Sequence, residues 1–103
     1  MAFISLDGPA AQGAISLTAA AVQEIKVGAS PLEERNVIEI QPIDGNIYYY
    51  YGDGTNTPNA ATVMSDGFLL RKERVKTLEA GPRQPIFVVA AAGTVDVRFA
   101  ERA

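Results

Sequence analysis

The chain contains no cysteine and no histidine among its 103 residues. Without cysteine there is no disulfide scaffold, no thiol nucleophile and no thiolate metal site. Without histidine, Ser-His-Asp and Cys-His catalysis and the histidine-based metal centres cannot be built. These two absences exclude most hydrolase mechanisms for this chain and leave the redox compartment undetermined.

Long apolar runs are also missing. The longest, residues 86–92, has seven residues, whereas a helix that crosses a bilayer needs about 20. The first residues lack a basic region and are interrupted by Asp7, Gly8 and Pro9 before a signal-peptide core can form. We therefore expect a soluble protein with no secretion signal.

Charge is modest and acidic overall, with twelve acidic and nine basic residues and a net charge of −3. This balance does not favour a nucleic-acid backbone as the partner. A chain of this length forms one domain with a small core, so neighbouring copies are a natural source of additional stability. Twelve carboxylates show no spacing that selects an acid and base pair, and we expect no enzymatic activity and no cofactor.

Glycine, proline and aspartate interrupt the chain at short intervals and leave apolar segments of four to nine residues. This spacing predicts an all-β fold, an antiparallel β-sandwich or β-barrel of about eight to nine short strands. A single helical turn is expected at residues 30–33, where Ser30 precedes Pro31. We expect an N-terminal arm at 1–12 and one β domain at 13–103. The predicted strands are 14–18, 21–27, 36–41, 47–51, 61–64, 68–71, 75–78, 86–91 and 94–99.

The last two predicted strands have the clearest pattern. A two-residue loop at Ala92 and Gly93 would make them a hairpin, with alternate residues from Ile86 to Phe99 on one core face. The opposite face then carries Phe87 and Val89 and is too apolar to face water. Its cover is predicted to be either a loop or the N-terminal segment, or else another copy of the chain.

Four consecutive tyrosines, Tyr48 to Tyr51, form the most unusual local feature. In a strand, alternate side chains point to opposite faces, so Tyr48 and Tyr50 lie on the face opposite Tyr49 and Tyr51. Three interpretations are open. The tyrosines are ordinary strand residues whose hydroxyl groups reach water at the border of the core, or they form a protein interface, or they form a platform on which sugar rings stack. We favour the interface over the sugar platform, because no tryptophan accompanies them.

The segment 71–76 (RKERVK) is the only basic cluster. If extended, it points Lys72, Arg74 and Lys76 to one side, which fits a solvated edge, a nucleic-acid groove or docking onto an acidic protein surface. The polar loop 52–59 has the oxygen atoms that calcium prefers but only one carboxylate, Asp53. A long hairpin loop is therefore the better interpretation, and we expect no metal site.

From about Arg35 onward the chain resembles small structural proteins of tailed bacteriophage virions. The resemblance lies in an arginine that leads a strand (35–41, RNVIEIQ), a strand that ends in an aromatic residue and glycine (47–52), a glycine turn (65–70) and the closing unit 85–98, with Glu101 near the end. The sequence departs from this pattern at Pro42 and in the length of the loop 52–60. The resemblance implies self-association, often as a trimer, attachment to a capsid or tail surface, and no catalytic residue.

These observations together predict a non-enzymatic virion protein, assembled in the host cytoplasm, that decorates a capsid and bridges its subunits. Its partners are other copies of itself, with a trimer as one option, and a major capsid or other virion protein, without nucleic acid, membrane or small-molecule substrate. The alternatives are a tail, baseplate or fibre component, or a carbohydrate-binding module that uses the tyrosine strand. The predicted interface residues are Tyr48, Tyr50, Phe87, Val89, Lys72, Arg74 and Lys76.

Overall fold

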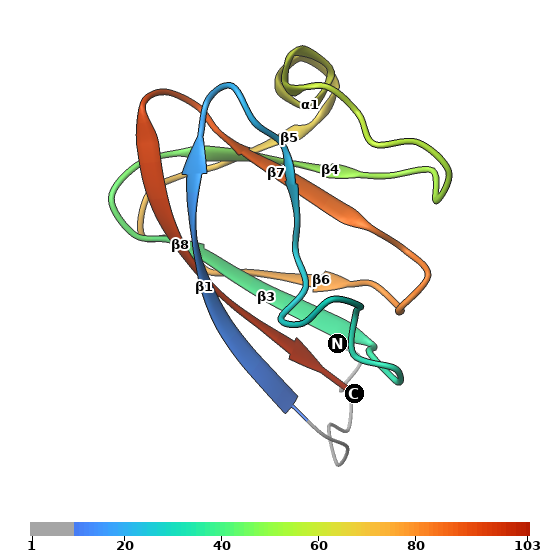
Figure 1. The fold of residues 1–103 in the computed structure, drawn as a ribbon. Helices are drawn as coiled ribbons and strands as arrows, with labels where there is room; N and C mark the ends of the chain where they lie inside the picture. The colour runs from blue at the N-terminus through green and yellow to red at the C-terminus, as the bar shows by residue number, and fades with distance from the viewer. Residues whose placement is uncertain (1–9) are drawn as a thin grey trace.

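The structure is a computed structural model that describes residues 10–103. Two four-stranded antiparallel sheets pack face to face (Figure 1). Sheet A has the strand order β1-β8-β3-β6 and sheet B the order β2-β7-β4-β5. The elements are β1 (Ala10–Thr18), β2 (Gln23–Glu24), β3 (Val37–Pro42), β4 (Ile47–Tyr51), α1 (Ala60–Asp66), β5 (Phe68–Leu70), β6 (Lys76–Glu79), β7 (Ile86–Ala90) and β8 (Thr94–Arg102).

This strand order is that of a jelly roll, in which eight strands form two sheets through Greek-key connections. The predicted all-β sandwich is therefore confirmed. Of the predicted arm at 1–12, Ala10 to Gln12 belong to β1 and the remainder lies outside the described residues. The single helix, α1, is too short to cross a membrane, and no other helix occurs in residues 10–103.

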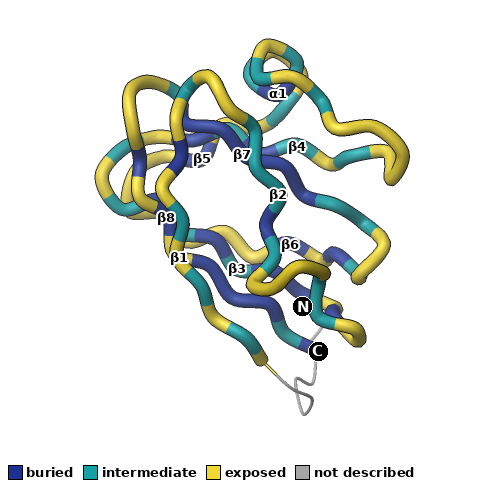
Figure 2. The backbone as a smooth tube through the Cα atoms, viewed as in Figure 1, coloured by how far each residue is buried: buried dark blue, intermediate teal, exposed yellow. Residues whose placement is uncertain are grey.

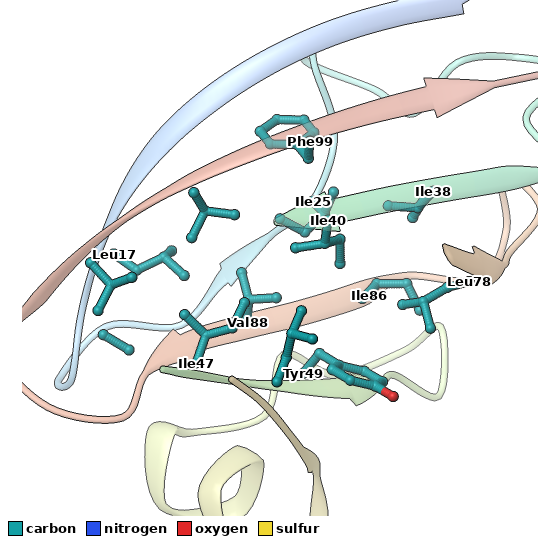
Figure 3. Packing of buried hydrophobic residues seen from close by; sticks show 14 of the residues in the cluster. Leu17, Ile25, Ile38, Ile40, Ile47, Tyr49, Leu78, Ile86, Val88 and Phe99 are labelled. Carbon is teal, nitrogen blue, oxygen red and sulfur yellow. The ribbon is translucent and has the colours of Figure 1, made fainter. Parts of the chain in front are cut away.

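The core lies between the two sheets, where inward-facing side chains from both sheets meet (Figure 3). Sheet A contributes Ile38, Ile40 and Phe99, and sheet B contributes Ile47 and Val88, all of them buried. Figure 2 shows that burial is concentrated on the central strands, while the connecting loops are exposed. Alternation along the strands places these residues in one layer, as expected for a sandwich.

The predicted hairpin between the last two strands is wrong, although its core face is right. Strands β7 and β8 belong to different sheets: β7 pairs with β2 and β4, and β8 pairs with β1 and β3. Gly93, at φ 61°, lies in the short connection that carries the chain from one sheet to the other. The six residues predicted to share a face meet across the sandwich core: Ile86, Val88, Ala90, Val95, Val97 and Phe99.

Two local predictions are also wrong. The predicted strand 61–64 is part of helix α1, because Asn59 caps the helix by accepting a hydrogen bond from the Thr62 amide at 2.8 Å. The predicted helical turn at 30–33 is absent from the described chain, where these residues form an irregular connection. There the Leu32 amide, which the predicted turn would have paired with the Ser30 side chain, donates to the Glu101 carboxylate at 2.9 Å.

Candidate functional site

Strands β5 and β6 border the same side of the molecule and follow each other in the chain. Each has only one strand neighbour among the described residues: β5 pairs with β4, and β6 pairs with β3. A five-residue turn, 71–75, joins them. We call β5, this turn and β6 the β5–β6 side; it is the candidate site because it unites open strand edges, positive charge and exposed apolar side chains.

Hydrogen bonds of the backbone amides hold the turn in place, and they do not involve the side chains of the turn. The Arg74 amide donates to the Arg71 carbonyl at 3.1 Å, and the Glu73 amide donates to the Pro42 carbonyl at 2.8 Å. The Lys72 amide donates to Asn46 Oδ1 at 2.8 Å. Glu73 has a left-handed φ of 69°, a conformation that costs a side-chain-bearing residue about 1 kcal/mol or more. The turn is therefore a fixed feature that presents its side chains to solvent.

Four of the nine basic residues of the chain lie on this side: Arg71, Lys72, Arg74 and Lys76. All four are exposed, and Glu73 is the one acidic residue between them. None takes part in the ion pairs of residues 10–103, which are Lys26–Glu24, Arg35–Glu101 and Arg102–Glu39. Glu79, at the end of β6, is the other acidic residue of this side, so the rest of the chain carries five basic and ten acidic residues and the positive charge is concentrated here.

Exposed apolar side chains gather at the same place. Tyr51, Phe68, Leu69 and Val75 are 41%, 56%, 44% and 59% exposed, and Val27 is the one other large apolar side chain exposed within residues 10–103. Phe68 stacks on Tyr49, with ring centroids 5.4 Å apart, and Tyr51 meets Tyr49 edge-on at 6.3 Å. Burial raises the pKa of the Tyr49 phenol above its ordinary value of 10.0, and Tyr51 adds to the shift.

Two of the predicted interface residues are not on the surface, which corrects the sequence interpretation. Phe87 is 6% exposed and Val89 is fully buried, because helix α1 covers the outer face of sheet B with Val63 at the contact. Tyr48 and Tyr50 pack at the border of this second cluster and are half-buried. The apolar face that seemed to need a partner is thus covered by the chain itself.

The three predicted basic residues, Lys72, Arg74 and Lys76, are all exposed and lie on a turn and at the start of a strand. Segment 71–75 is not extended, so the predicted alternation of side chains along one strand does not occur. Sequence reasoning missed Phe68 and Val75 as surface residues. The available signal was the closeness of both to the charged run 71–74, which Val75 directly follows and Phe68 precedes by three positions.

A buried ion pair closes the end of the sandwich where β3 begins and β8 ends. Arg35 and Glu101 are 1% exposed, and Arg35 Nη1 lies 3.1 Å from Glu101 Oε2. The other guanidinium hydrogens reach the carbonyls of Ile25, Ala80, Gly81 and Gln84 at 2.7 to 3.3 Å. All five N–H donors of Arg35 are therefore satisfied.

Glu101 completes this cluster by accepting backbone bonds as well. The Val27 amide donates to Oε1 at 2.6 Å, and the Leu32 amide donates to Oε2 at 2.9 Å. The pair thereby ties two connections, residues 25–36 between β2 and β3 and residues 80–85 between β6 and β7, to the last strand. Its role is structural, and the sequence contained both residues within the phage-like pattern without indicating that they pair.

The polar loop 52–59 satisfies its own carboxylate. Asp53 Oδ1 accepts from the amides of Thr55 at 2.8 Å and Asn56 at 2.9 Å, and these bonds lower the pKa of the carboxyl. Within residues 10–103, no group of three or more histidine, cysteine or acidic side chains is placed to hold a metal ion. Asp53 therefore organises a loop turn.

Two shallow hollows also open on the surface. One, of about 670 Å³, lies on sheet A beside Gln12, Glu39 and Arg98, and Val75 of the β5–β6 side borders it. The other, of about 590 Å³, lies between the loops that contain Lys26 and Arg83. Both have mixed polar and apolar linings, and neither contains the cations of the β5–β6 side.

Comparison with known proteins supports the fold alone. No family model matches the chain, and no curated protein matches it. The structure is similar to the cupin domain of Schizosaccharomyces pombe Cnp3, with a TM-score of 0.57 and 12% identity over 98% of this chain and 57% of that one. It also matches a protein of Bacillus endospore appendages, described as disulfide-linked pili, with a TM-score of 0.40, 12% identity and coverage of 99% and 95%. The chain thus spans little more than half of the cupin structure, and the first similarity agrees with the jelly-roll architecture.

Proposed function

We propose that this chain is a non-enzymatic structural protein of a bacteriophage virion, a decoration protein that attaches to an acidic surface of the capsid through its β5–β6 side. The observation that carries the proposal is the coincidence on that side of three exposed apolar side chains with two strand edges and four cations that have no partner within residues 10–103. Each feature alone is ordinary for a surface. Together they provide both the steering charge and the apolar area of a protein-binding site.

Binding at this side combines two terms of different range. Arg71, Lys72, Arg74 and Lys76 attract an acidic partner from a distance, an effect that weakens as salt screens it beyond about 8 to 10 Å. Phe68, Leu69 and Val75 then contribute about 25 cal/mol per Å² of apolar area removed from water. A virion repeats such a site in many copies, so a modest single contact gives firm attachment.

The virion setting rests on the resemblance of residues 35 to 101 to phage structural proteins. The jelly-roll fold agrees with this setting, because viral capsid domains use the fold, as do lectins and cupins. The buried Arg35–Glu101 pair joins the first and last motifs of that resemblance in one structural cluster. The proposed location is therefore the capsid surface, after assembly in the host cytoplasm.

The proposal is tested by co-sedimentation of the purified chain with undecorated capsids built from the major capsid protein encoded in the same genome. The native chain is expected to sediment with the capsids to saturation. Lys72→Glu combined with Arg74→Glu is expected to weaken binding at least tenfold, because it places negative charge against an acidic surface.

The matched control is Lys26→Glu combined with Arg83→Glu, which changes net charge equally on two loops away from the β5–β6 side. This control is expected to bind like the native chain. Absence of co-sedimentation by the native chain would refute the decoration role. Equal loss in both double variants would show that overall charge, rather than this side, determines binding.

A further inference from the structure

The four border strands of the two sheets differ in how they avoid pairing with other chains. Strand β2 has two residues and β5 has three, and β6 carries Lys76 and Glu79. Short length and charge are the usual protections of an open edge. Strand β1 has neither, because it extends over nine residues (AAQGAISLT) without a charge or a proline.

The unpaired backbone groups of β1 can be assigned from its contacts. The carbonyl of Ser16 accepts from Gln23 Nε2 at 3.2 Å and therefore points away from β8. Asp96, which lies opposite Ser16 on β8, accepts a hydrogen bond from the Ile43 amide at 2.8 Å, so its carbonyl points away from β1. Backbone groups alternate in an antiparallel pair, so those of Ala10, Gln12 and Ala14 also point to the open edge. No strand of residues 10–103 pairs with them there.

From this arrangement we infer that β1 is a self-association surface, at which two copies of the chain pair their β1 strands antiparallel across a two-fold axis. The axis passes near Gln12, which places Ala10 of one copy opposite Ala14 of the other. The stretch 10–14 is used because the Gln23 side chain already occupies the edge at Ser16. The product is one continuous sheet formed by the two A sheets.

The second copy is favoured as the occupant because the edge is neutral and self-complementary. Two chains with a net charge of −3 repel least where neither carries charge. Pairing through the β5–β6 side would instead bring four cations of each copy together. A two-fold arrangement also closes on itself and forms no fibre.

This inference adds self-association to the proposed function, and it leaves the β5–β6 side free to bind a capsid. The two proposals fail separately. Solution mass tests the β1 pairing without any capsid, whereas co-sedimentation tests capsid attachment whatever the oligomeric state.

The test is sedimentation equilibrium of the full chain over a range from about 1 µM to about 1 mM, the range of weak specific association. The native chain is expected to approach twice its 11.0 kDa mass with rising concentration. Ala14→Pro is expected to weaken association by roughly tenfold or more, because each dimer loses two backbone hydrogen bonds. Gln12→Lys is expected to weaken it several-fold, because like charges then lie directly opposite each other.

The matched control for Gln12→Lys is Thr77→Lys, which adds the same charge at an exposed position of β6, at the other border of sheet A. It is expected to associate like the native chain. Thermal unfolding of each variant checks that it is folded. If the proline variant does not fold, the Gln12→Lys variant still tests the inference. The inference is overturned if the native chain stays at 11.0 kDa throughout. It is also overturned if the Gln12→Lys variant dimerises as strongly as the Thr77→Lys variant.

Discussion

Replacing Glu101 by glutamine is expected to destabilise the fold by about 3 to 5 kcal/mol, the cost of breaking a buried ion pair from one side. The structure explains the size of this effect. Both carboxylate oxygens of Glu101 accept hydrogen bonds, one from the Val27 amide and the other from the Leu32 amide and Arg35. A glutamine must turn its NH₂ group toward one set of these donors, and it also leaves the Arg35 charge buried without a counter-charge.

This loss is large relative to the stability of the domain. Small domains have only about 5 to 15 kcal/mol of stability, and each kcal/mol corresponds to about 4 to 8 °C in Tm. The Tm of Glu101→Gln is therefore expected to fall by on the order of 20 °C. Urea unfolding followed by circular dichroism gives the free energy directly, provided that the slope with denaturant is unchanged.

A second ion pair provides the matched control. Arg102 Nε lies 3.0 Å from Glu39 Oε1 without the alignment of a hydrogen bond, and the two side chains are 41% and 34% exposed. Glu39→Gln is expected to cost less than about 1 kcal/mol, as exposed pairs do. If Glu101→Gln proves as mild as Glu39→Gln, the description of the Arg35 cluster as a buried ion pair that holds two loops in place is wrong.

Three further predictions concern other parts of the fold. Asn59→Ala removes the cap of helix α1 and is expected to cost about 1 kcal/mol in urea unfolding, with no loss if the cap is not formed. Gly67→Ala is expected to lower the free energy of unfolding by about 1 to 3 kcal/mol, because a methyl group there would lie 2.4 Å from the Val63 carbonyl oxygen and 2.5 Å from that of Tyr49. Its control is Gly28→Ala, where the added methyl group meets nothing closer than 3.8 Å. Because the pKa of Tyr49 is raised in the folded state, its contribution to stability is complete below pH 10 and is lost as the pH rises through the folded-state pKa. Tyr49→Phe is therefore expected to reduce the fall of Tm at alkaline pH. A fall of Tm equal to that of the native chain would contradict this.

The inward and outward faces of the strands could be predicted from sequence, but their neighbours could not. Alternation from Ile86 to Ala90 and from Val95 to Phe99 identifies the core face, because side chains of a strand alternate whatever the strand pairs with. Which strands share a sheet depends on contacts between distant parts of the chain. In the jelly roll, β8 lies between β1 and β3, so the short connection at Gly93 joins two sheets and is not a hairpin turn.

The covered face of sheet B shows the same limit. The apolar character of Phe87 and Val89 correctly indicated that something must cover them, but alternation cannot show what does. The cover is helix α1, whose segment 61–64 appears strand-like because Val63 and Met64 are apolar. The deciding signal was local, since Asn59 is a favoured capping residue three positions before Thr62.

Hydrogen exchange of the chain in complex with undecorated capsids tests the central claim most directly. The account predicts that the amides of residues 68–77, on the β5–β6 side, exchange more slowly in the complex than in the free chain. Protection confined to helix α1 or to the loops around Lys26 and Arg83, with residues 68–77 exchanging as in the free chain, would contradict it.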